Sequence, residues 1–160
     1  MSLDRKQITI DNDIFFQSVE EMLEQGLSVD IKVKGFSMRP FLRDGIESVR
    51  LVRISAEELK RGDVVLFRHN GRHTLHRYFG IREGKLIFKG DGNCCLTEQT
   101  EPAEVVARVA RIIHPDGMVT DYGTKAWRRK SRHSLMCKAL RTPIFIAKQI
   151  VKRVIRGSRG

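Results

Sequence analysis

Residues 27 to 34 have the sequence Leu27-Ser28-Val29-Asp30-Ile31-Lys32-Val33-Lys34. Apolar and polar side chains alternate along this stretch, so an extended chain presents one apolar face and one polar face. This alternation is typical of a strand that packs one face on a hydrophobic core and leaves the other in water. The pattern stops at Gly35, where we expect the strand to end.

Several short runs further along the chain have the composition of strands, and turn sequences separate them. The pairs Asn70-Gly71, Glu83-Gly84 and Asp116-Gly117 predict tight hairpin turns. We expect strands at 48–54, 64–67, 74–81, 86–89, 105–113 and 118–122, and a single helical turn at 56–60. Many short strands joined by turns predict a mainly β fold, either a β-sandwich or a partly open barrel.

Helices are expected at both ends of this β region. Near the amino terminus, Asp11 or Asp13 can cap a helix that ends at Gly26. Its apolar face should hold Phe15, Val19, Met22 and Leu23. Near the carboxyl terminus, apolar residues recur at helical spacing over 134–156, and Pro143 should start or kink a helix there.

The net charge of +11 is concentrated at one end of the chain. The segment from Lys125 to Arg159 has twelve Lys and Arg residues and no Asp or Glu, whereas residues 1–124 hold 18 cations and all 19 acids. We therefore expect a nearly neutral domain at 1–123 followed by a basic amphipathic tail at 124–160.

Length and composition exclude several classes of protein. A chain of 160 residues has room for one core and an appendage, and not for a large multidomain enzyme. Its three cysteines, Cys94, Cys95 and Cys137, have the spacing of neither a disulfide framework nor a metal site. A secretory signal and a membrane-spanning run are both missing from the sequence, so we expect a protein of the reducing cytoplasm.

The stretch with most chemical information follows the first strand: Gly35-Phe36-Ser37-Met38-Arg39-Pro40-Phe41-Leu42-Arg43-Asp44-Gly45. It resembles the nucleophile box of the signal peptidase and LexA-like serine peptidase superfamily, in which Ser-Met-x-Pro follows the end of a strand. Three further boxes occur in the family's order. They are 61–67, similar to a Gly-Asp-Val-Val strand, Leu75-His76-Arg77-Tyr78, similar to the segment with the general base, and 88–93, similar to a Lys-Gly-Asp-x-Asn box.

The resemblance implies a set of site residues. Ser37 is the nucleophile and His76, at a position where many relatives have Lys, is the general base, with Asp91 as its orienting acid. A base is needed because a serine hydroxyl is a poor nucleophile until its proton is removed, and an oriented histidine removes it near neutral pH. The oxyanion would be held by the backbone at Ser37 and Gly35. The substrate would contact Met38 and Pro40, and the family needs no cofactor.

Some features depart from the family. Relatives often have a hydroxyl residue where this chain has Gly35. They also have Gly-Asp where this chain has Asp44-Gly45-Ile46-Glu47, so either Asp44 or Glu47 can occupy the position of the family's aspartate. Asp63 is expected to be structural. These departures leave open an alternative, a non-catalytic peptide-binding or regulatory module of the same fold.

The basic tail has three interpretations: a solvated extension, a nucleic-acid contact, or a helix on a membrane surface or partner. Charge alone suits nucleic acid. Apolar residues between Ile144 and Ile155 favour docking of 134–156 on an anionic membrane surface. Together with the family resemblance, the sequence predicts a serine endopeptidase that cleaves a leader or precursor peptide, cytoplasmic and peripheral on the inner membrane face.

Overall fold

The structure is a computed structural model that describes residues 12–157, with side chains described for 14–152. Its centre is an antiparallel sheet of eight strands that curls into a half-barrel, so the expected mainly β class is confirmed. The strands follow the order β1-β2-β7-β3-β4-β5-β6, and β8 pairs with β7. Their bounds are β1 Val29–Lys32, β2 Ser48–Arg53, β3 Val64–His69, β4 Arg72–Arg82, β5 Lys85–Lys89, β6 Glu98–Thr100, β7 Val105–Ile113 and β8 Val119–Asp121.

Most strands lie where the alternation and the turn residues predict them. The three hairpin turns are confirmed, since Asn70-Gly71 joins β3 to β4, Glu83-Gly84 joins β4 to β5, and Asp116-Gly117 precedes β8. Asn70 and Glu83 have the positive φ angles, 50° and 52°, that such tight turns require. The helical turn expected at 56–60 is a 3-10 helix, Ala56–Glu58, and a second 3-10 helix spans Pro102–Glu104. Strand β6 was not predicted.

Two hydrophobic clusters fill the space around the sheet. The larger one joins α1, β1, β2, β7 and the segment after β1, with Phe41, Leu42, Val49 and Leu51 fully buried. The smaller one lies inside the curl formed by β3, β4 and β5 and holds Val65, Phe67, Tyr78, Leu86 and Phe88. The Phe67 and Phe88 rings stack with centroids 4.0 Å apart. Ile31 and Val33 are buried as the alternation predicts, whereas Leu27 is 49% exposed and Val64 to Phe67 of β3 are buried on both faces.

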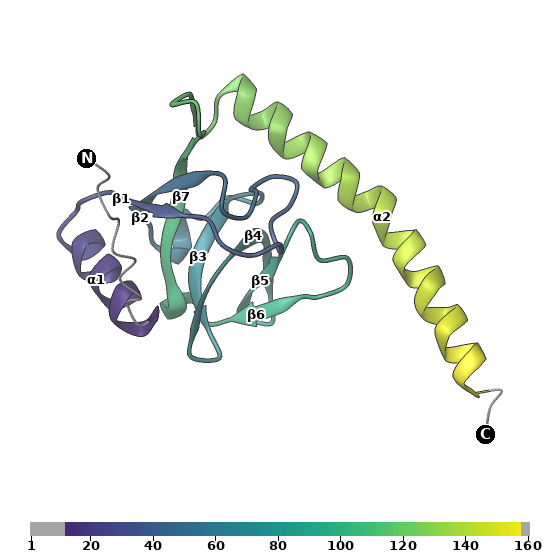
Figure 1. Ribbon diagram of the computed structural model, residues 1–160. Coiled ribbons are helices and arrows are strands. Elements are labelled where there is room, and N and C mark those ends of the chain that lie inside the picture. Colours follow the sequence, from purple (N-terminus) through teal and green to yellow (C-terminus); the bar gives the residue numbers. More distant parts are fainter. Residues whose placement is uncertain (1–11, 158–160) are drawn as a thin grey trace, which may run out of the picture.

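The first helix, α1 (Asn12–Glu24), covers the sheet beside β1 and β2 (Figure 1). Its buried residues are Val19 and Leu23, with Phe16 packed against the same cluster. The predicted face was partly wrong, because Phe15 and Met22 are exposed to 37% and 41%. The helix ends before Gly26, as expected, and Leu27 N–H donates to Met22 O. Asp11 and the side chain of Asp13, the two expected caps, lie outside the described residues.

The second helix, α2 (Lys125–Gly157), is longer than expected. It begins nine residues before Ser134 and continues through Pro143. Its first half lies against the sheet, and its second half extends away from it at the side of β4 to β6 (Figure 1). Trp127 fixes the start of the helix, because its buried ring packs edge-on against Phe41 and Tyr122. The first part of the predicted tail therefore folds with the domain.

Candidate active site

Ser37 lies in a tight loop that follows β1. Buried side chains on its carboxyl side, Met38, Phe41 and Leu42, anchor the loop in the larger core cluster. Phe36, just before Ser37, is 64% exposed. A turn hydrogen bond from Arg39 N to Phe36 O, 3.2 Å, closes the backbone around Ser37. The half-exposed Ser37 is therefore held at the surface by the buried side chains that follow it in the loop.

Asp44 and Glu47 both support this loop, in different ways. Asp44 Oδ1 accepts the N–H of Gly35 at 2.7 Å and so fixes the residue that precedes the loop. Glu47 is fully buried and accepts from Arg43 N at 2.6 Å and from Lys130 Nζ of α2 at 3.0 Å, with His114 Nδ1 3.5 Å away. Burial acts to raise the pKa of Glu47, but the hydrogen bonds from Arg43 and Lys130 outweigh it and leave the pKa below its ordinary value.

We expect Glu47→Gln to reduce the loss of stability in acid. Because the folded-state pKa of Glu47 lies below the ordinary value of 4.5, its stabilising contribution is present above that pH and is lost as the pH falls through the folded-state pKa. Urea unfolding at about pH 6 and about pH 3 checks this. The wild-type protein should lose more free energy of unfolding between the two pH values than E47Q, and parallel losses would contradict the assignment.

His76 lies on β4, where it pairs with Val65 of β3, and its side chain is buried, with 4% exposed. Its Nδ1 atom makes a short hydrogen bond with Oε2 of Glu98, the first residue of β6. A carboxylate on Nδ1 fixes the tautomer and ring orientation and directs Nε2 to the opposite side of the ring. The structure therefore gives His76 an acidic partner, Glu98, that the sequence analysis did not identify.

Nε2 of His76 and the Ser37 loop meet at Gly90. A methyl group built on Gly90 would lie 2.5 Å from Ser37 O, 3.0 Å from Nε2 of His76 and 3.0 Å from Nδ2 of Asn93. Gly92 N–H also donates to Ser37 O at 2.7 Å. Only glycine leaves room for three groups to approach so closely. The Ser37 backbone carbonyl and Nε2 of His76 thus both lie beside Gly90, whereas the described residues show no hydrogen bond between the Ser37 hydroxyl and His76.

Asp91 has a different place from the one expected. Its carboxylate accepts two hydrogen bonds from the guanidinium of Arg77, at 2.8 and 2.6 Å, and one from Ser134 Oγ of α2 at 2.6 Å. Both side chains of the ion pair are fully buried. Arg77 also donates to Gly62 O and to Ser131 Oγ of α2, both at 2.8 Å. Asp91 therefore holds the 90–93 segment to β4 and α2, and the acid on His76 is Glu98.

Helix α2 reaches the site from the outside. Lys138 Nζ donates to Gly90 O at 2.6 Å. Burial lowers the pKa of Lys138, although the negative charge of Asp91 acts in the opposite direction. Ser134 and Lys138 thus attach α2 to Asp91 and Gly90, and Ser131 attaches it to Arg77 of β4.

Other expected site residues are placed as follows. The N–H group of Gly35 donates to the Asp44 carboxylate within the loop, so it is not available as a second oxyanion donor. Met38 is 3% exposed and belongs to the core, whereas Pro40 is half-buried beside it. Asp63 is structural, as expected: it accepts from Lys60 N at 3.0 Å and from the Tyr122 hydroxyl at 2.7 Å.

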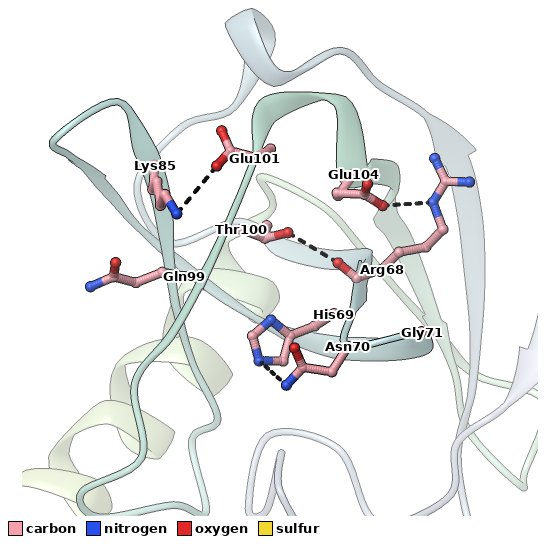
Figure 2. Close-up of a pocket in the computed structure, with 9 residues that line it drawn as sticks. All are labelled: Arg68, His69, Asn70, Gly71, Lys85, Gln99, Thr100, Glu101 and Glu104. Carbon is pink, nitrogen blue, oxygen red and sulfur yellow. Dashed lines mark hydrogen bonds and ion pairs between the residues drawn. The ribbon is translucent and has the colours of Figure 1, made fainter.

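The polar pocket drawn in Figure 2 lies at the β3–β4 turn and along β6, with a volume of about 470 Å³. Its charged side chains are paired with one another, Arg68 with Glu104 at 2.9 Å and Lys85 with Glu101 at 3.3 Å. Ser37, His76 and Glu98 do not line it. We assign it no part in the chemistry of the site.

Within the described residues, 12–157, no group of His, Cys, Asp and Glu side chains has the arrangement of a metal site. Serine, histidine and glutamate are residue types that can serve as nucleophile, base and orienting acid, and of these contacts the structure shows the one between His76 and Glu98. In comparisons with known proteins, no family model matches the chain and no curated protein matches it.

Proposed function

We propose that the protein is a serine endopeptidase of the signal peptidase type, with Ser37 as nucleophile, His76 as general base and Glu98 as the acid that orients the base. One observation carries the proposal: the Ser37 loop and Nε2 of His76 meet at Gly90 while Glu98 occupies Nδ1. The four sequence boxes support the same assignment. Glu98 replaces Asp91 in the third role.

The proposed reaction is a two-step acyl transfer. Nε2 of His76 takes the proton of the Ser37 hydroxyl as Oγ attacks the peptide carbonyl, and Glu98 stabilises the imidazolium that forms. His76 then gives the proton to the leaving amine, which becomes the amino terminus of the carboxyl-side product. In the second step, His76 takes a proton from water as the water oxygen attacks the acyl ester, and it returns that proton to Oγ of Ser37 as the acid product leaves. The backbone N–H of Ser37 is the proposed oxyanion donor.

An extended peptide or precursor protein is the proposed substrate. Strand β1 is the terminal strand of the order and leads directly into the Ser37 loop. A peptide that adds to this edge would be held by main-chain hydrogen bonds and would bring its carbonyl groups past Ser37. The free state of Cys94, Cys95 and Cys137 fits the proposed location in a reducing cytoplasm.

Labelling with a fluorophosphonate, a reagent that phosphonylates activated serines, tests the proposal without knowledge of the natural substrate. We expect one adduct on the folded protein, at Ser37, because only a serine with a positioned base reacts quickly. Heat-unfolded protein and the Ser37→Ala variant should remain unlabelled. A folded protein that gives no adduct would favour the non-catalytic alternative, and an adduct at another serine would overturn the assignment of Ser37 as the nucleophile.

A further inference from the structure

Between Met136 and Val151, α2 presents an apolar stripe that nothing in the described part of the protein covers. The stripe consists of Met136, Leu140, Ile144, Ala147 and Val151, whose spacing of three or four residues places them on one face of the helix. Leu140 is 71% exposed, Ile144 59% and Val151 56%. A contiguous apolar surface of this kind marks an interaction site.

The stripe faces away from the domain. Ser134 and Lys138 contact Asp91 and Gly90, and Met136 and Leu140 each follow one of these residues by two positions. At 3.6 residues per turn, two positions correspond to about 200° around the helix axis. The contacts of Ser134 and Lys138 therefore orient α2 with the stripe on the side of the helix opposite to Asp91 and Gly90. The second half of the helix extends away from the sheet (Figure 1).

The charges of α2 indicate what kind of surface the stripe binds. The helix has no acidic residue, and Arg141, Lys148 and Lys152 lie along one side of the stripe. A second copy of the same helix would bring like charges together, which is unfavourable. A surface that is negative and also accepts aliphatic side chains satisfies both features, and an anionic lipid bilayer has both properties.

We propose that α2 docks the protein on an anionic lipid bilayer, with the stripe in the interfacial region and the flanking cations at the headgroups. No helix within 12–157 is long and apolar enough to cross a membrane, so α2 lies along the surface. Lys and Arg stems extend apolar carbon toward the bilayer while their charges remain at the headgroups. The proposal does not depend on the proposed peptidase activity. If both hold, the contacts of Ser134 and Lys138 keep the Ser37 site close to the membrane.

Co-sedimentation of the full chain with lipid vesicles tests this docking. We expect binding to vesicles of equimolar phosphatidylglycerol and phosphatidylcholine, weakening as salt is added, and little binding to phosphatidylcholine alone. Two variants remove one component each: Ile144→Gln with Val151→Gln, and Lys148→Gln with Lys152→Gln. Each should reduce partitioning on the order of tenfold.

Matched controls separate the stripe from general surface properties. Ile81→Gln with Met118→Gln alters two equally exposed apolar residues elsewhere, and Arg72→Gln with Arg82→Gln removes two exposed cations from β4. Both control proteins should bind like the wild type. Equal binding by the α2 variants and the controls would overturn the proposal, as would binding to nucleic acid with none to vesicles. Circular dichroism confirms that each variant is folded.

Discussion

Replacing Glu98 by glutamine should slow phosphonylation of Ser37 by about three orders of magnitude or more, although the geometry of the site is kept. Glutamine preserves the shape of Glu98 but removes the charge that stabilises the His76 imidazolium. It can also donate to Nδ1 and so favour the tautomer with its proton on Nε2, which cannot act as a base. The rate of labelling by a fluorophosphonate measures the effect directly.

Two further variants of the protein test whether the effect is specific to Glu98. Glu101→Gln changes an exposed glutamate three residues away that pairs with Lys85, and it should label at the wild-type rate. The double variant Ser37→Ala with Glu98→Gln should hydrolyse an activated ester no more slowly than Ser37→Ala alone, because residues that act as one unit are not additive. A Glu98→Gln protein that labels at the wild-type rate would contradict the role assigned to Glu98.

The sequence predicted the supporting strands of the site because their pattern has a local cause. Alternating apolar side chains and glycine-containing turns determine where β1 to β5 and β7 begin and end, within a few residues. The Ser37 loop and the segment 90–93 follow directly from these strands. Their approach was implied by the family resemblance, and in the structure Ser37 O and Nε2 of His76 both lie beside Gly90.

Glu98 could not be found in the same way. Strand β6 has three residues, Glu98, Gln99 and Thr100, with no apolar alternation, so it has no periodic signal. Its pairing with β5 places Glu98 opposite Phe88. The curl of the sheet then brings Glu98 to His76, 22 residues earlier in the chain. This contact depends on tertiary structure, and a residue count does not reveal it.

The role of Asp91 was predicted incorrectly for a related reason. Asp91 lies next to Gly90, which contacts His76, so its position in the chain is compatible with a place in the site. The side chain is directed instead to Arg77, which neighbours His76 on β4. Successive residues of a strand point to opposite faces. One face of β4 therefore holds the candidate base and the other holds the ion pair that supports it.

Replacing Asp91 by alanine should lower the free energy of unfolding by about 3–5 kcal/mol, because it leaves the Arg77 charge buried without its partner. The guanidinium has no access to water, since Arg77 is 0% exposed. The substitution also removes the acceptor of Ser134 Oγ, which belongs to the attachment of α2. Urea denaturation followed by circular dichroism gives the midpoint and slope from which this free energy is obtained.

The chain contains a matched control for this prediction. Asp30 accepts two hydrogen bonds from Arg50 at 2.7 and 2.8 Å, so the pair has nearly the same geometry as Asp91 with Arg77. Its side chains are 38% and 40% exposed, and water can solvate either partner once the other is gone. Asp30→Ala should therefore cost at most about 1 kcal/mol. The difference between the two alanine variants isolates the effect of burial.

A double substitution keeps the prediction testable if Asp91→Ala fails to fold. Replacing Arg77 by methionine and Asp91 by leucine removes both charges, so no charge is left buried alone, and the protein should be more stable than Asp91→Ala. It should still lose some attachment of α2, because Ser131 and Ser134 lose their partners. A double variant as unstable as the single one would show that shape or hydrogen bonding, and not the isolated Arg77 charge, makes Asp91 necessary.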